Sequence, residues 1–130
     1  MPTTQPLAAS QPGPATADEL TVAIAEHAAE VATRHVLADI AAERRRQDEK
    51  WGEQNHPDGT GGELWTLERD QRIRITDHRF AEGTGTWSDV LAEEFAEAMA
   101  EIDPDRLRAE LVQVAAVATG WIEAIDRRPL

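Results

Sequence analysis

The chain has 130 residues, enough for one domain with one modest hydrophobic core. Its formal net charge of −12 at pH 7 argues against non-specific binding to DNA, RNA or anionic membranes, because their phosphates would be repelled. With no cysteine, disulfides and thiolate metal sites are excluded, and an aromatic content of only 5% leaves a core of Ala, Leu, Ile, Val and Trp that favours helices.

The N-terminal part of the chain divides into a tail and a long helix. Residues 1–15 are rich in Pro, Ser, Thr and Gln and have no periodic apolar face, so we predict a disordered tail. Thr16, followed three residues later by Glu19, has the form of a capping box and predicts a helix over residues 18–49. There is no basic start followed by an apolar run, and no stretch is apolar enough to span a membrane. We therefore expect a cytoplasmic protein without membrane contact.

A glycine-rich loop is predicted over residues 50–63, because Gly and Pro are concentrated there. So long a connection in a small domain is usually functional or disordered. Lys50, the only lysine of the chain, stands beside Trp51 at the start of this loop, and the pair indicates phosphate contact and base stacking. In the alternative interpretation Trp51 anchors the loop by packing and Lys50 is simply solvated. Asn55 is a candidate for reading a base edge, or for stabilising a turn of the loop.

Three further helices are predicted after the loop. A helix over residues 64–82 is only roughly periodic, and a third helix is expected over residues 86–102. Asp103 followed by Pro104 is typical of a helix start, with an N-cap residue and a proline at the first helical position. The fourth helix is expected to end near residue 126.

These elements predict an all-α fold with four helices of unequal length, forming a single domain over residues 16–128. The apolar face of the long first helix is larger than a small monomer can easily cover. We therefore expect a homodimer or a homotetramer.

The last two predicted helices carry oxygen-bearing side chains at matching offsets from their apolar seams. At about 100° per residue, Glu94 and Glu110 lie about 60° from the seam of their own helix, and Glu97 and Gln113 about 120° from it, all on the same side. Antiparallel packing would present these four side chains to one cleft. Carboxylate and amide oxygens are suitable ligands for Mg²⁺ or Mn²⁺. The alternative is a solvated acidic face. The seam residues are Leu91, Phe95, Ala98 and Ile102 on the first of these helices, and Leu107, Leu111, Val114, Ala118 and Ile125 on the second.

The order of these residues resembles a known family signature. Glu93-Glu94-x-x-Glu97, then twelve intervening residues, then Glu110-x-x-Gln113 resembles the MazG signature, EExxE followed by ExxD. The resemblance covers roughly residues 37–128, and residues 43–54 are similar to a segment of MazG-like proteins from phages and actinobacteria.

The resemblance implies a MazG-like four-helix bundle that oligomerises, binds Mg²⁺ and cleaves a nucleoside triphosphate between its α and β phosphates. The products would be the monophosphate and pyrophosphate. By position, Glu94, Glu97 and Glu110 match metal ligands, whereas Gln113 replaces the family's Asp and brings an oxygen without a charge. Glu97 is the candidate for both metal ligand and general base, and Glu93 the candidate for assisting it.

The expected substrate is a ribo- or deoxyribonucleoside triphosphate, contacted by Lys50, Trp51 and Asn55, with Mg²⁺ as cofactor and no nucleic-acid partner. A second hypothesis is a non-catalytic dimerisation or regulatory module that retains a weak metal or nucleotide site. Gln113 favours this second hypothesis, and the pairing of Lys50-Trp51 with a complete set of three Glu favours the enzyme. A di-iron bundle is excluded because it needs Glu-x-x-His on two helices, and this sequence has the motif only inside the loop.

Overall fold

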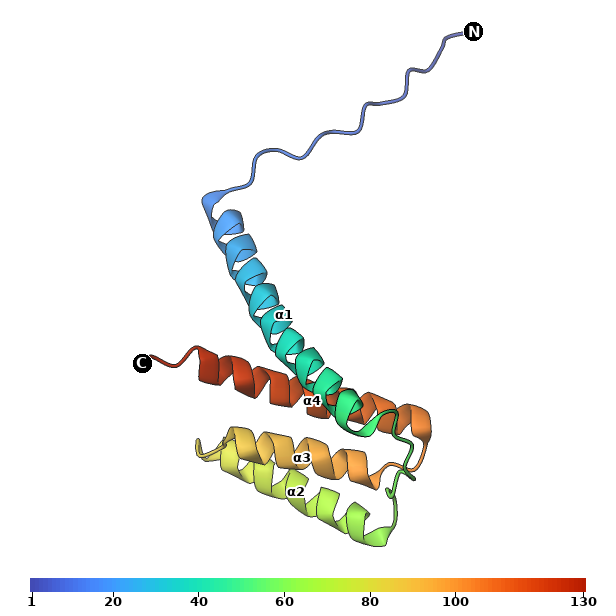
Figure 1. Ribbon diagram of the computed structural model, residues 1–130. Helices are drawn as coiled ribbons and strands as arrows, with labels where there is room; N and C mark the ends of the chain where they lie inside the picture. The colour runs from blue at the N-terminus through green and yellow to red at the C-terminus, as the bar shows by residue number, and fades with distance from the viewer. The chain divides into compact units, whose positions relative to one another are not determined.

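The computed structural model describes residues 1–130 and contains four α-helices and no strand. Figure 1 shows the four helices, and the predicted all-α fold is confirmed. Each predicted helix lies within a few residues of an observed one. The helices are α1 (Ala17–Trp51), α2 (Glu63–Ala81), α3 (Trp87–Ala100) and α4 (Pro104–Asp126). None of them combines the length and the apolar composition that crossing a bilayer requires.

The chain separates into two units, residues 1–31 and residues 32–130. In the first unit, residues 1–16 form neither helix nor strand. The predicted capping box then starts α1, because Thr16 N donates to Glu19 Oε2 at 2.6 Å and Glu19 N donates to Thr16 Oγ1 at 3.2 Å. The apolar side chains of this part of α1 are exposed: Leu20, Val22 and Ile24.

In the second unit, α3 lies between α2 and α4, and consecutive helices run in opposite directions (Figure 1). The part of α1 that belongs to this unit lies against α4, where Thr33 Oγ1 donates to a carboxylate oxygen of Glu123. Few apolar side chains are fully covered. The buried hydrophobic residues of the chain are Val36, Ala96, Ala98 and Leu107.

The start of α3 is fastened both to its own first turn and to α2. Thr86 and Asp89 form a capping box, in which Asp89 N donates to Thr86 Oγ1 at 3.2 Å and Thr86 N donates to Asp89 Oδ2 at 3.1 Å. Thr76 of α2 donates its hydroxyl to the Asp89 carbonyl at 3.3 Å, and the Asp89 side chain also lies 3.7 Å from Arg79 Nε. Asp89 is consequently only 3% exposed, a burial that the sequence did not predict because its partners come from another helix.

A sharp connection turns the chain from α3 into α4. Asp103 caps α4 by accepting a hydrogen bond from Arg106 N at 3.0 Å, and Pro104 follows it at the helix start, as predicted. The loop before α2 is attached to the same end of α3, since Gly61 N donates to the Met99 carbonyl at 2.8 Å. Gly61 has φ +87°, and a Cβ there would lie 2.6 Å from Ile102. Only glycine suits this position, because it tolerates both the left-handed backbone and the close approach.

The predicted apolar seams are covered only in part. Ala98 and Leu107 are buried, whereas Phe95 and Leu111 are each 46% exposed and Ile102 is 74% exposed. Helical periodicity places residues on a common stripe but does not show which part of the stripe a neighbouring helix covers. The two buried alanines of α3, Ala96 and Ala98, lie about 200° apart around the helix axis, so small side chains allow close approach on two sides of α3.

Candidate metal centre

Three glutamates from α3 and α4 form a carboxylate cluster, which we define as Glu94, Glu97 and Glu110. One carboxylate oxygen from each lies within 4.8 Å of the others. Glu94 and Glu97 are three residues apart on α3, so they share one side of that helix, and the antiparallel α4 brings Glu110 beside them. The structure therefore brings together three of the four side chains that the sequence assigned to a metal.

Burial makes this cluster costly without a counter-charge. Glu94 Oε2 and Glu110 Oε2 are both inaccessible to solvent and have no hydrogen-bond partner. A buried carboxylate oxygen that is left unpaired destabilises the folded chain. A divalent cation with oxygen ligands would supply the missing partner for both atoms, so the donor set fits Mg²⁺ or Mn²⁺.

The pKa values of two carboxyl groups in the cluster are raised, as expected for carboxylates that are buried close together. The pKa of Glu97 is raised to about 6, chiefly by burial and also by the charges of Glu94, Glu93 and Glu110, while Arg69 opposes the rise. Burial likewise raises the pKa of Glu94, with smaller contributions from Glu110 and Glu93. A carboxyl group that titrates near neutral pH is able to exchange a proton under physiological conditions.

Glu93 lies at the edge of the cluster, on the side of α2. Burial raises the pKa of its carboxyl, the neighbouring Thr76 side chain lowers this pKa, and the charge of Asp77 raises it. Gln113 is exposed and makes no hydrogen bond to a cluster residue. Its amide is therefore open to solvent, unlike the buried oxygens of Glu94 and Glu110.

The candidate substrate residues at the end of α1 stay together but do not contact the cluster. Lys50 Nζ lies 4.6 Å from the centre of the Trp51 ring, a cation–π geometry, and Trp51 remains 57% exposed. Asn55 is exposed in the loop. Their side chains make no hydrogen bond or ion pair with Glu94, Glu97 or Glu110.

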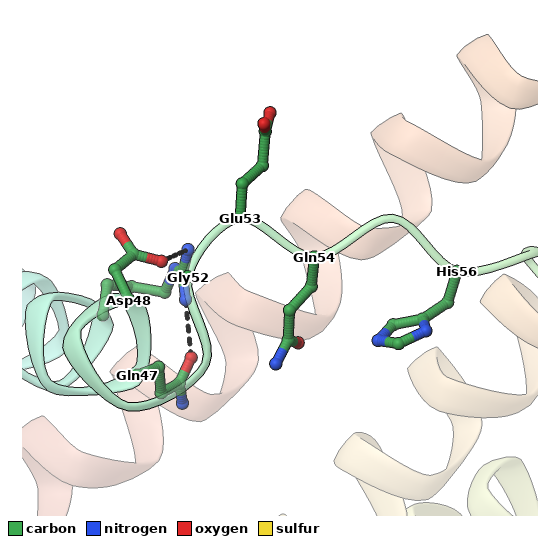
Figure 2. A pocket seen from close by; sticks show the side chains of 7 residues that line it. Gln47, Asp48, Gly52, Glu53, Gln54 and His56 are labelled. Atoms are coloured by element: carbon green, nitrogen blue, oxygen red, sulfur yellow. Dashed lines mark hydrogen bonds and ion pairs between the residues drawn. The ribbon is translucent and has the colours of Figure 1, made fainter.

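A cavity of about 700 Å³ lies beside these residues, formed by the end of α1 and the following loop. Figure 2 shows Gln54 and His56 projecting to one side of the loop, while Glu53 projects to the other. Arg44 donates to Gln47 Oε1 at 2.7 Å and to Asp48 Oδ1 at 2.9 Å. The complete lining is Arg44, Gln47, Asp48, Gly52, Glu53, Gln54 and His56.

This cavity was not predicted from the sequence, although it belongs to the segment that carries the resemblance. The available signal was the helical spacing of Arg44, Gln47 and Asp48, which places all three on the side of α1 from which the loop departs. A second residue that the sequence did not single out is Arg69 on α2, the only basic side chain that lowers the pKa of Glu97.

Comparison with known proteins adds no relative to this description. No protein-family model matches the chain, and the searches of curated proteins and of solved structures find no similar protein.

Proposed function

We propose that the protein is a Mg²⁺-dependent nucleoside triphosphate pyrophosphohydrolase, related to the MazG-like family that its sequence resembles. The observation that supports this proposal most directly is the pair of buried, unpartnered oxygens of Glu94 and Glu110, beside Glu97 in one cluster. A structural acidic surface would expose such atoms to water. These atoms are instead withdrawn from solvent, as metal-ligating carboxylates are.

Each carboxylate of the cluster has a role in this proposal. Glu94, Glu97 and Glu110 would hold the cation, and Gln113 would contribute a neutral oxygen from the exposed edge. Bound Mg²⁺ or Mn²⁺ would neutralise phosphate charge and make a coordinated water more acidic. Glu97 would also accept the proton of the attacking water, because a carboxylate of the cluster lies within reach of a water bound to the cation. Glu93 would assist by orienting Glu97 or the water.

The reaction consumes one water molecule. The water oxygen forms a bond to either the α or the β phosphorus. The bond between that same phosphorus and the oxygen bridging the α and β phosphates breaks, and the released proton passes to the base. The products are a nucleoside monophosphate and pyrophosphate. We assign Lys50 to phosphate contact, Trp51 to stacking on the base and Asn55 to the base edge, which the exposure of all three side chains permits.

The test is pyrophosphate release from a panel of ribo- and deoxyribonucleoside triphosphates with Mg²⁺, with Mn²⁺ and with EDTA. Wild-type protein should release pyrophosphate and a monophosphate only when metal is present. Glu97→Gln should reduce the rate by at least about a hundredfold, because it removes both a ligand charge and the base. Glu82→Gln is the matched control, since Glu82 pairs only with His78 on the surface and should leave the rate unchanged. Equal rates in wild type and Glu97→Gln would disprove this assignment of the cluster.

A non-catalytic dimerisation or regulatory module is the second candidate function. The absence of a charge at Gln113 and the lack of contact between Lys50-Trp51 and the cluster favour it. Folded protein that binds Mg²⁺ but releases no pyrophosphate from any nucleotide of the panel would support this module and reject the enzyme.

A further inference from the structure

The carboxylate cluster has a basic neighbour whose position follows from the packing of α2 on α3. Thr76 donates its hydroxyl to the Asp89 carbonyl, which sets the two helices in register. Because the helices are antiparallel, moving seven residues back along α2 from Thr76 to Arg69 moves about as far forward along α3 from Asp89. Arg69 therefore lies opposite the turn of α3 that contains Glu97.

The guanidinium of Arg69 is oriented by Asp70, but some of its N–H donors have no partner. Its Nε and Nη2 lie 3.2 Å and 3.1 Å from Asp70 Oδ1, so both contacts go to a single oxygen. Its Nη1 makes no hydrogen bond or ion pair, and the side chain is 34% exposed. A guanidinium with one fixed edge and one open edge is suited to bind a phosphate through parallel hydrogen bonds.

The negative charge of the site would be balanced better with a positively charged side chain beside it. Three ionised carboxylates would outweigh one divalent cation, and a triphosphate brings further negative charge. The other arginine near this face of α2, Arg72, lies 4.0 Å from the buried carboxylate of Asp89 and is engaged there. Arg69, which the helix register places opposite the turn of α3 that contains Glu97, is the arginine that remains to supply this charge from α2.

We propose that Arg69 binds the phosphate chain of the substrate beside the carboxylate cluster, with Asp70 fixing the orientation of its guanidinium. This inference rests on the proposed function, because it assigns a phosphate-binding residue to the same site. It supplies a cation from α2, outside the two helices that carry the sequence signature. It also accounts for an arginine at the edge of an otherwise acidic cluster.

Binding of inorganic tripolyphosphate tests the inference without requiring hydrolysis. In calorimetric titrations with Mg²⁺ present, Arg69→Gln should weaken tripolyphosphate binding by at least about tenfold, the loss expected for one charged hydrogen-bonding contact. Arg69→Lys should show a smaller loss, because it retains the charge but not the planar donor pair. The matched control is Arg74→Gln, an exposed arginine on another side of α2 that makes no ion pair, and it should bind as wild type does.

A purely structural role for Arg69 predicts a different result. Removing a positive charge next to the cluster should leave Mg²⁺ binding alone unchanged or tighter, whereas general damage to the site would weaken both ligands. Opposite or unequal effects on Mg²⁺ and tripolyphosphate, in protein with unchanged circular dichroism, therefore support the inference. Equal tripolyphosphate affinity in wild type, Arg69→Gln and Arg69→Lys overturns it.

The same variants separate this inference from the proposed function. Tripolyphosphate binding that depends on Arg69, in a protein that hydrolyses no nucleotide, would retain the phosphate-binding role and reject the enzyme. Metal-dependent hydrolysis with the same KM in wild type and Arg69→Gln would retain the enzyme and reject the role of Arg69. A wild-type protein that binds no tripolyphosphate in the presence of Mg²⁺ would reject both.

Discussion

At the scale of single residues, carboxyl groups with raised pKa values and buried oxygens without a hydrogen-bond partner lie together on one side of α3. Glu93, Glu94 and Glu97 all have a pKa raised chiefly by burial. Two buried oxygens there lack a partner, one on Glu94 and one on Glu110. Such groups destabilise a fold unless something else binds them, so their presence supports the proposed metal site.

The raised pKa of Glu97 predicts how stability depends on pH in the absence of metal. The group titrates at 4.5 in its ordinary state and at about 6 in the folded chain. Between these pH values the folded protein holds more protons than the unfolded chain, so this group makes the free energy of unfolding fall as pH rises from about 4.5 to about 6.

Urea denaturation in EDTA across this pH range measures the effect. Glu97→Gln cannot ionise and should give a shallower decrease than wild type. Identical pH profiles for the two proteins would show that Glu97 is not buried in the way that raises its pKa.

At the scale of the helices, local start signals explain where three of the four helices begin. Thr16 with Glu19, Thr86 with Asp89, and Asp103 before Pro104 all behave as caps in the structure. The cap of α3 has an additional role, because Asp89 also contacts three side chains of α2: Arg72, Thr76 and Arg79. Capping there determines both where α3 begins and how it meets its neighbour.

The α3 cap should be measurable as stability. Thr86→Ala removes the hydroxyl that accepts from Asp89 N and donates to Asp89 Oδ2, and should lower the free energy of unfolding by about 1 kcal/mol. Thr86→Ser keeps the hydroxyl and should restore most of the loss. Urea denaturation compares the three proteins, and an unchanged midpoint for Thr86→Ala would mean that the capping box does not stabilise α3.

At the scale of the whole molecule, the single chain covers too little apolar surface for a core of its own. Two grooves on α2, α3 and α4 have mainly apolar linings and share Ala92 and Phe95, so they form one continuous surface. Leu64, at its edge, is 82% exposed. Continuous apolar surface of this kind is typical of a protein that pairs with another chain.

We accordingly expect a homodimer or homotetramer in solution, with this apolar surface at the contact. Sedimentation velocity at micromolar concentration should give a mass above that of one 14.3 kDa chain. Leu64→Glu should shift the protein toward the monomer, because it places a charge in the contact without removing buried packing within the chain. Arg74→Gln, which also lowers the net charge by one, is the exposed control on another side of the same helix. A monomer at all concentrations would contradict the expectation.

The helices and the pairing of Glu94 with Glu97 could be predicted from the sequence because both depend on short-range order. Capping residues act within one turn, and the three-residue spacing of Glu94 and Glu97 places them together on any helix. Glu110 could be added because the short connection at Asp103-Pro104 leaves α4 no direction but antiparallel. The tertiary structure alone decided which apolar residues are covered, that Asp89 is buried, and that Arg69 stands opposite Glu97. Each of these depends on the register between two helices, a long-range property that the periodicity of one helix does not contain.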